Sequence, residues 1–217
     1  MVLNIQHKAY ELVIFDWDGT LMDTIGKIVS CMQNVAQELI LPIPSEQQIR
    51  DVIGLSLPKI MPILFADHQN HEQIIDCYRR HHVANVHPTP LFEGVESLIR
   101  SLHAGGYQLA VATGKGREGL DNVLARTGLG QYFHATRCAD DAESKPHPEM
   151  LFSLLTHFDV AADRAIMIGD SIHDLTMAKN AGMASIGVSY GAHNQSKLQA
   201  LNPRAIVDKP LAIRDYL

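Results

Sequence analysis

Four aspartates are the residues of this chain whose types and spacing could do chemistry together. Asp16 and Asp18 lie two positions apart directly after a short apolar run, and Asp170 and Asp174 lie four positions apart after another. Ligands of open α/β sheets bind where the strands end, so carboxylates there would face one point. Such a cluster repels itself unless a cation is present, and hard oxygen ligands favour Mg²⁺. The pattern therefore indicates a magnesium-assisted reaction.

A hydroxyl, a glycine amide and a lysine complete the set. Thr113 and Gly114 follow a further apolar run, where a hydroxyl and a backbone N–H can bind a phosphate oxygen at a helix start. Lys145 lies in a loop that is interrupted by two prolines. A metal, a lysine and a hydroxyl beside a carboxylate suit phosphoryl transfer, in which positioning and charge stabilisation do most of the work.

Each motif alone also has a purely structural explanation. Asp18-Gly19 is a common turn signal, Thr113 can cap a helix, and Asp174 can favour a helix start through the helix dipole. A lone loop lysine such as Lys145 is usually a solvated charge. The functional interpretation therefore depends on the combination.

Alternating strands and helices must position these residues. The predicted strands are Leu12–Phe15, Tyr107–Ala112, Ala165–Ile168, Ala184–Val188 and Ala205–Val207. Amphipathic stretches between them end in glycine, as helices commonly do. This alternation predicts an α/β fold with a doubly wound, Rossmann-like parallel sheet.

One region breaks the alternation. From Leu21 to Val86 apolar residues recur at helical spacing, and no convincing strand is found. Ser45 and Gln48 resemble a capping box inside this region. We therefore predict a core domain of residues 1–20 and 87–217, interrupted by a helical cap domain of residues 21–86. The run His87–Pro90 is the predicted hinge back to the core.

Taken in this order, the motifs resemble those of the haloacid dehalogenase superfamily. The matching residues are Asp16-x-Asp18-Gly-Thr-Leu for the first motif, Thr113 for the second, Lys145 for the third, and Gly169-Asp170-Ser-x-x-Asp174 for the fourth. The helical insert resembles the C1-type cap of the phosphoglycolate phosphatase-like branch. The resemblance implies a phosphoric monoester hydrolase that uses Mg²⁺ to hydrolyse small phosphorylated metabolites, phosphoglycolate-type phosphomonoesters among them.

The resemblance also implies a role for each matching residue. Asp16 would be the nucleophile that forms an aspartyl-phosphate, and Asp18 would be the general acid and base. The implied catalytic and phosphate-binding residues beside them are Thr113, Gly114 and Lys145. The implied metal ligands are Asp16, Asp18 through its backbone carbonyl, Asp170 and Asp174.

Candidates for substrate specificity are Arg50 and Trp17. Arg50 and the neighbouring Ile53-Gly54 resemble a cap segment that faces the active site, and Arg50 could bind a substrate carboxylate or second phosphate. An exposed helical arginine is the open alternative, as is simple packing for Trp17. We expect His81 and His82 to be surface residues.

The composition of the chain limits the kinds of partner that it could bind. The chain has 217 residues with 18 basic and 24 acidic side chains, a net charge of −6, which argues against a nucleic-acid polymer as partner. The longest apolar run is far shorter than the roughly 18 residues of a membrane span. No signal peptide is visible, so we expect a cytoplasmic protein. The three cysteines have no C-x-x-C spacing and are expected to be free thiols.

Other activities stay open at this point. A phosphomutase of the same superfamily would also keep Asp18. A phospho-acceptor without turnover, such as a receiver-like domain, is the alternative from another class, although the helical insert and the Asp16-x-Asp18 pair argue against it. A binding protein with an idle site would carry the same motifs. The chain could be a monomer or a homodimer.

Overall fold

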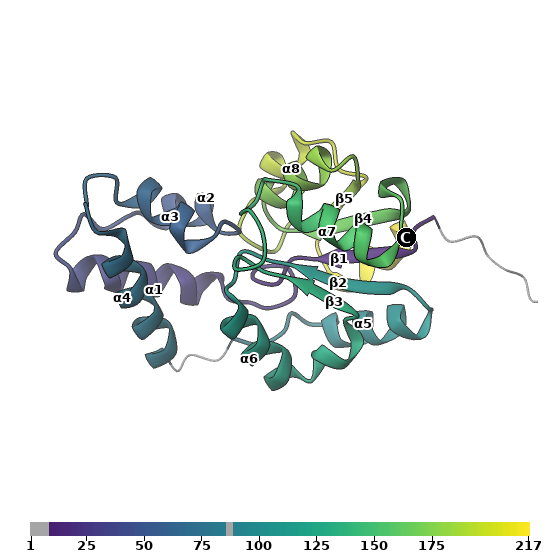
Figure 1. The fold of residues 1–217 in the computed structure, drawn as a ribbon, viewed down its shortest axis with the longest axis horizontal. Helices are drawn as coiled ribbons and strands as arrows, with labels where there is room; N and C mark the ends of the chain where they lie inside the picture. The colour runs from purple at the N-terminus through teal and green to yellow at the C-terminus, as the bar shows by residue number, and fades with distance from the viewer. Residues whose placement is uncertain (1–8, 86–88) are drawn as a thin grey trace, which may run out of the picture.

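The computed structural model describes residues 9–85 and 89–217, and within them one parallel sheet forms the centre of the molecule (Figure 1). Its strands are β1 (Leu12–Phe15), β2 (Gln108–Ala112), β3 (Ala135–Arg137), β4 (Ala165–Gly169), β5 (Ala184–Val188) and β6 (Ala205–Val207). The strand order is β3-β2-β1-β4-β5-β6. The chain winds outward from β1 in both directions, so the predicted doubly wound sheet is confirmed.

Helices cover both faces of this sheet. Their bounds are α5 (Val95–Ala104), α6 (Arg117–Thr127), α7 (Glu149–Phe158), α8 (Ile172–Asn180) and α9 (Gln195–Gln199). Figure 1 shows α5 and α6 on one face and α7 and α8 on the other. Successive side chains of a strand point to opposite faces. Val13 and Phe15 of β1 accordingly pack in the cluster of α5 and α6, while Leu12 and Ile14 pack in the cluster of α7 and α8.

All five predicted strands are present, with bounds that differ by at most one residue at an end. The prediction missed β3 (Ala135–Arg137), which pairs with β2 at the edge of the sheet. Its three residues are only half-buried. A strand this short and polar carries no apolar signal in the sequence.

The region between β1 and α5 is helical, as predicted. Its helices are α1 (Ile25–Glu38), α2 (Glu46–Val52), α3 (Leu57–Leu64) and α4 (His71–Ala84). They lie to one side of the sheet in Figure 1 and enclose a hydrophobic cluster of their own, with Met32, Ile49 and Met61 fully buried. The predicted capping box of Ser45 and Gln48 is present at the start of α2.

We propose that α1–α4 act as a cap domain of residues 21–86 on a core of residues 1–20 and 87–217. The second boundary and most of the predicted hinge His87–Pro90 lie outside the described residues. On its described side, Met22 pairs with Leu91, and the Asp23 N–H donates to the carbonyl of Pro90. The chain thus enters and leaves the helical unit at one place.

Two further predictions concern the chain as a whole. Cys31, Cys77 and Cys138 are free and buried, as expected. Within residues 9–85 and 89–217, the structure contains no helix with the length and apolar character that crossing a bilayer requires.

Candidate active site

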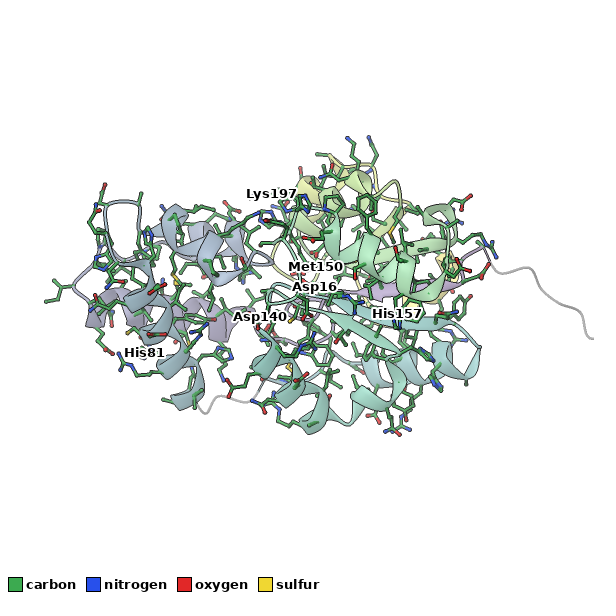
Figure 2. All side chains as sticks on the ribbon, in the orientation of Figure 1. Asp16, His81, Asp140, Met150, His157 and Lys197 are labelled. Atoms are coloured by element: carbon green, nitrogen blue, oxygen red, sulfur yellow. The ribbon has the colours of Figure 1, made fainter. Side chains whose placement is uncertain are left out.

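The separated motifs converge at the carboxyl ends of three neighbouring strands. Asp16 follows β1, Thr113 follows β2, and Asp170 follows β4, with β1 in the middle of the three. Lys145 comes from the loop between β3 and α7. Figure 2 places Asp16 at the centre of the molecule, where the core meets the cap helices. Residues up to 158 positions apart, such as Asp16 and Asp174, therefore share one site.

Lys145 is the centre of an ion-pair network. Its side chain is 0% exposed, and its Nζ lies 2.8 Å from Asp16 Oδ1 and 2.6 Å from Asp174 Oδ1. Burial, together with repulsion from Asp174 and Asp18, raises the pKa of Asp16 to about 7 against the lowering effect of Lys145. The two carboxylates raise the pKa of Lys145 in turn. The solvated-charge alternative for Lys145 is therefore wrong.

Hydrogen bonds orient Asp174 and Asp170, the other two buried aspartates. Asp174 accepts from the N–H and the Oγ of Ser171 at 3.1 and 2.6 Å, which forms a capping box at the start of α8. Asp170 accepts from Thr20 Oγ1 at 3.0 Å and from the Ala192 N–H at 2.6 Å. Burial and the nearby Asp174 and Asp16 raise the pKa of Asp170 well above its usual value.

The backbone around Asp170 leaves no space for a side chain. Gly19 has φ +78°, and a Cβ there would overlap the Asp170 carboxylate. A Cβ at Gly191 would meet the Asp170 side chain and the carbonyl of Gly19. Glycine is the residue that allows a left-handed turn and such a close approach. The Asp-Gly turn predicted from the sequence thus has a positional role beside Asp170.

The carboxylates fit a small divalent cation. Oxygens of Asp16, Asp170 and Asp174 lie within 4.8 Å of one another, and all three residues are buried. Lys145 supplies one positive charge against these three acids, and the raised pKa of Asp170 reflects the remaining repulsion. A hard cation with oxygen ligands would compensate this charge, and Mg²⁺ commonly binds through one or two carboxylates.

Lys115 is a functional neighbour that the sequence prediction missed. Its Nζ lies 3.0 Å from Asp18 Oδ2. Burial alone would raise the pKa of Asp18, but Lys115 and a hydrogen bond from Thr24 outweigh it and lower the pKa. The other oxygen, Asp18 Oδ1, is buried without a hydrogen-bond partner among the described residues. Lys115 directly follows the Thr113-Gly114 motif, which was the available signal.

Thr113 and Gly114 take the predicted place at the end of β2. Thr113 is buried, and its Oγ1 accepts from the Lys115 N–H at 3.3 Å. It is not a helix cap, because α6 begins at Arg117 after Gly116. A Cβ at Gly114 would collide with the carbonyls of Gly54 and Leu55. The cap loop after α2 therefore rests on the phosphate-binding turn that the sequence predicts.

A cavity of about 670 Å³ lies between the two units. Asp16, Asp18 and Thr113 line it from the core. The cap contributes Ile53-Gly54, as predicted, together with apolar side chains such as Ile60 and Tyr78. The geometry thus places two carboxylates and a hydroxyl at the wall of one cavity between the sheet and the helical unit.

The structure does not bring Arg50 or Trp17 to this cavity, which corrects both specificity predictions. Arg50 pairs with Glu46 at 2.7 Å and reaches the Gly191 carbonyl at 3.4 Å, at a separate small pocket. Trp17 is fully buried, because its ring packs against Phe133 in the core.

His81 and His82 were both predicted to be surface residues, and the structure leaves neither of them fully exposed. His81 is partly exposed and pairs with Glu38 at 2.7 Å, on cap helices that lie away from Asp16 in Figure 2. His82 lines the cavity. Neighbouring residues of a helix point in different directions, so one histidine faces the cavity while the other faces outward.

Comparison with known proteins agrees with the geometry. Residues 13–188 match the family model of haloacid dehalogenase-like hydrolases. A probable phosphatase, IndB, of Dickeya dadantii is 39% identical over 204 residues, which cover 91% of this chain and 89% of that protein. A phosphoglycolate phosphatase of Vibrio parahaemolyticus is 32% identical over 214 residues, which cover 91% of this chain and 92% of that protein.

Solved structures show the same fold. A haloacid dehalogenase-like family hydrolase of Streptococcus pneumoniae superposes with a TM-score of 0.84 at 24% identity and covers 96% of this chain and 98% of its own. A phosphatase of Clostridium acetobutylicum, described as predicted, superposes with a TM-score of 0.83 at 25% identity with the same coverage. The chain therefore belongs to the haloacid dehalogenase-like hydrolase family and is a phosphatase of that family.

Proposed function

We propose that this protein is a Mg²⁺-dependent phosphatase that hydrolyses small phosphomonoesters, of the phosphoglycolate type, through an aspartyl-phosphate on Asp16. The observation that carries the proposal is the convergence of Asp16, Asp18 and Thr113 on one cavity, with the buried Lys145 paired to Asp16, and with Asp170 and Asp174 beside them. The names of the relatives, phosphoglycolate phosphatase and pyrophosphatase among them, support phosphate ester or anhydride substrates.

In the proposed reaction, Asp16 and Asp18 carry out the first half. Hydrogen bonds from the Trp17 N–H at 2.7 Å and from Lys145 fix Asp16 Oδ1, which leaves Oδ2 for attack on phosphorus. The bond from phosphorus to the leaving oxygen breaks, and Asp18 donates a proton to that oxygen. Lys145 and the Thr113 hydroxyl bind the phosphoryl oxygens.

The second half regenerates the enzyme. Asp18, now a carboxylate, takes a proton from a water molecule whose oxygen attacks phosphorus, and the bond to Asp16 breaks to release inorganic phosphate. Mg²⁺, when bound by Asp16, Asp170, Asp174 and the Asp18 carbonyl, would neutralise the charge of the carboxylates and of the phosphoryl group. The cap excludes other water from the site.

The test is phosphate release from a panel of phosphorylated metabolites by the purified protein with Mg²⁺. We expect multiple turnovers with at least one phosphomonoester. Transfer of phosphate between positions of one sugar without release would instead establish the phosphomutase. A stable phosphoprotein without turnover would establish the phospho-acceptor, and silence with every compound would favour the idle binding protein.

Mg²⁺ is expected to stabilise the fold through the buried carboxylates. A ligand at about 100 times its Kd adds about 2.7 kcal/mol, which corresponds to a rise in Tm of about 5–10 °C for a chain of this size. Asp170→Asn removes one ligand and should shrink that rise, while Asp208→Asn, an exposed position, should not. Thermal melts with Mg²⁺ and with EDTA measure this. An equal rise in the parent and in Asp170→Asn contradicts the assignment.

The rise in Tm is also expected to depend on pH. The pKa of Asp16 is raised to about 7, so below that pH a proton occupies a ligand that Mg²⁺ needs. Mg²⁺ binding then releases a proton, and its stabilising effect grows as the pH rises from about 6 to about 8. Melts at both pH values check the direction, and a larger effect at the lower pH contradicts it.

Lys115→Met is expected to shift the pH profile of the reaction. The substitution removes the charge 3.0 Å from Asp18, so the pKa of Asp18 rises. A general acid must be protonated to donate, and kcat/KM reports the free enzyme, so the alkaline limb of kcat/KM moves to higher pH. Lys209→Met, at an exposed position, is the matched control. An unmoved limb in Lys115→Met contradicts the role of Asp18.

A further inference from the structure

The cavity contains more positive charge than its carboxylates balance. Its basic side chains are Lys27, Arg79, Lys115, Arg117 and Arg126. Three of them have carboxylate partners, in the ion pairs Arg79–Asp76, Lys115–Asp18 and Arg117–Asp141. Among residues 9–85 and 89–217, Lys27 and Arg126 form no ion pair. These two cations are therefore available to a ligand.

Neutral acceptors hold both cations in place. Lys27 of α1 donates from Nζ to the Asn85 carbonyl at 2.9 Å. Arg126 of α6 donates from Nη2 to Thr89 Oγ1 at 3.0 Å and lies 3.6 Å from Met22 Sδ. Burial lowers the pKa of Lys27, and the positive charges of Arg126 and Lys115 lower it further. Like charges kept close without an anion indicate a preorganised site.

His82 of α4 lies beside these cations. Its ring stacks on Tyr78 at a centroid distance of 5.7 Å, and its Nδ1 is buried without a hydrogen-bond partner in the described part of the chain. Burial, together with Lys115 and Lys27, lowers its pKa to about 4, so the ring is neutral near neutral pH. His82 lines the same cavity as the two cations, so its neutral ring offers an N–H donor to a ligand there.

We propose that Lys27, His82 and Arg126 form a subsite for a second anionic group on the leaving alcohol, a carboxylate or a second phosphate. The proposal rests on the phosphatase function proposed above and names the chemistry of its substrate. An anion there would compensate Lys27 and Arg126 and accept a hydrogen bond from the neutral ring of His82. Carbon atoms between the two anionic groups would contact Ile28 and Tyr78, which line the same cavity.

The subsite joins the two units of the molecule. Lys27 and His82 belong to cap helices, whereas Arg126 belongs to the core helix α6. A second anion on the substrate would therefore be held by charged side chains of both the cap and the core. The subsite takes over the role that the sequence assigned to Arg50, which lies at another pocket.

The test compares substrates that differ only in the second anion. The pairs are 2-phosphoglycolate with ethyl phosphate, 3-phosphoglycerate with glycerol 3-phosphate, and propane-1,3-diol bisphosphate with propyl phosphate. Hydrogen bonds to charged groups are worth about tenfold or more each, so we expect kcat/KM of the parent to favour the anionic member of at least one pair by about tenfold or more, chiefly through KM. The first two pairs report a carboxylate and the third a phosphate.

Substitutions at the three subsite residues test whether these residues cause the preference for a second anion. Lys27→Met and Arg126→Met should each reduce the ratio of the two kcat/KM values by about tenfold, and His82→Phe should reduce it as well. Arg100→Met is the matched control, because Arg100 is exposed on α5 and pairs with Glu96 away from the cavity. Raising the ionic strength should lower the parent's ratio, since salt screens charges. A ratio near one in the parent, or one that the variants leave unchanged, overturns the proposal.

A binding measurement that needs no turnover tests the anion subsite separately from the proposed phosphatase function. Asp16→Asn is titrated by calorimetry with 2-phosphoglycolate, with the bisphosphate, and with ethyl phosphate and propyl phosphate, which lack the second anion. Preference for the anionic compounds in a protein whose parent releases no phosphate would support the subsite and contradict the phosphatase. Equal binding of both members in every pair overturns the subsite, whatever the turnover.

Discussion

Asp16→Asn is expected to abolish turnover, with kcat lowered on the order of 10⁴-fold or more, as for other nucleophiles that act within one catalytic unit. The amide cannot form the acyl phosphate, and the remaining groups at the site bind the substrate without a nucleophile. Phosphate release under saturating substrate and Mg²⁺ measures the loss. In the parent, acid quenching during turnover should leave phosphate on the peptide that contains Asp16.

The fold of Asp16→Asn should survive. The pKa of Asp16 is raised to about 7 because its charge is buried among other acids, so removing that charge relieves repulsion, and Lys145 keeps its bond to Asp174 at 2.6 Å. We expect a Tm without Mg²⁺ that equals or exceeds the parent's. Asp23→Asn is the control, since Asp23 is exposed seven positions further along. Turnover by Asp16→Asn at the parent's rate would show that the nucleophile lies elsewhere.

The elements of the core could be predicted because they are buried on both faces. Strands such as Leu12–Phe15 read as continuous apolar runs, and the glycine after α6, Gly128 with φ +68°, ends the helix as the sequence indicated. The edge strand Ala135–Arg137 has neither signal, and only its pairing with β2 defines it. Pro62 lies inside α3 without ending it, since tertiary packing of Ile60 and Met61 holds the helix.

In the site, likewise, features next to a predicted strand could be predicted, whereas contacts between residues far apart in the sequence could not. The carboxylates could be located because each follows a strand that the sequence predicts. The environment of Lys145 could not be predicted, because its partners Asp16 and Asp174 lie 129 and 29 positions away and only the fold brings them to its Nζ.

The substrate side of the cavity was the least predictable part. Arg50 and Trp17 were plausible from their neighbours in sequence, but helix orientation turns Arg50 to Glu46, and core packing encloses Trp17. His82 was assigned to the surface because a single histidine in a polar helix carries no positional signal. Its place depends on how α4 packs on α1, where Cys77 and Tyr78 are buried.

Lys145→Met is expected to destabilise the protein strongly. The side chain is fully buried, and its loss leaves Asp16, Asp170 and Asp174 without the ammonium that compensates them. Breaking a buried ion pair by removing one partner costs about 3–5 kcal/mol, which corresponds to a fall in Tm on the order of 10 °C for a chain of this size. Methionine nearly matches the length of lysine, so the effect reports charge rather than a cavity. Thermal and denaturant unfolding without Mg²⁺ measure it.

The loss of stability in Lys145→Met is expected to depend on pH and on the acids that Lys145 contacts. Without the ammonium the carboxylates have higher pKa values in the folded than in the unfolded chain, so the folded state binds more protons and its stability falls as the pH rises. The deficit should therefore be larger at about pH 8 than at about pH 5. Adding Asp174→Asn to Lys145→Met should recover part of the loss, because one of the uncompensated charges is removed. Lys179→Met, an exposed lysine on α8, is the control and should unfold like the parent. If Lys145→Met unfolds like Lys179→Met at both pH values, the buried acids do not need the ammonium of Lys145, which contradicts its role as their compensating charge.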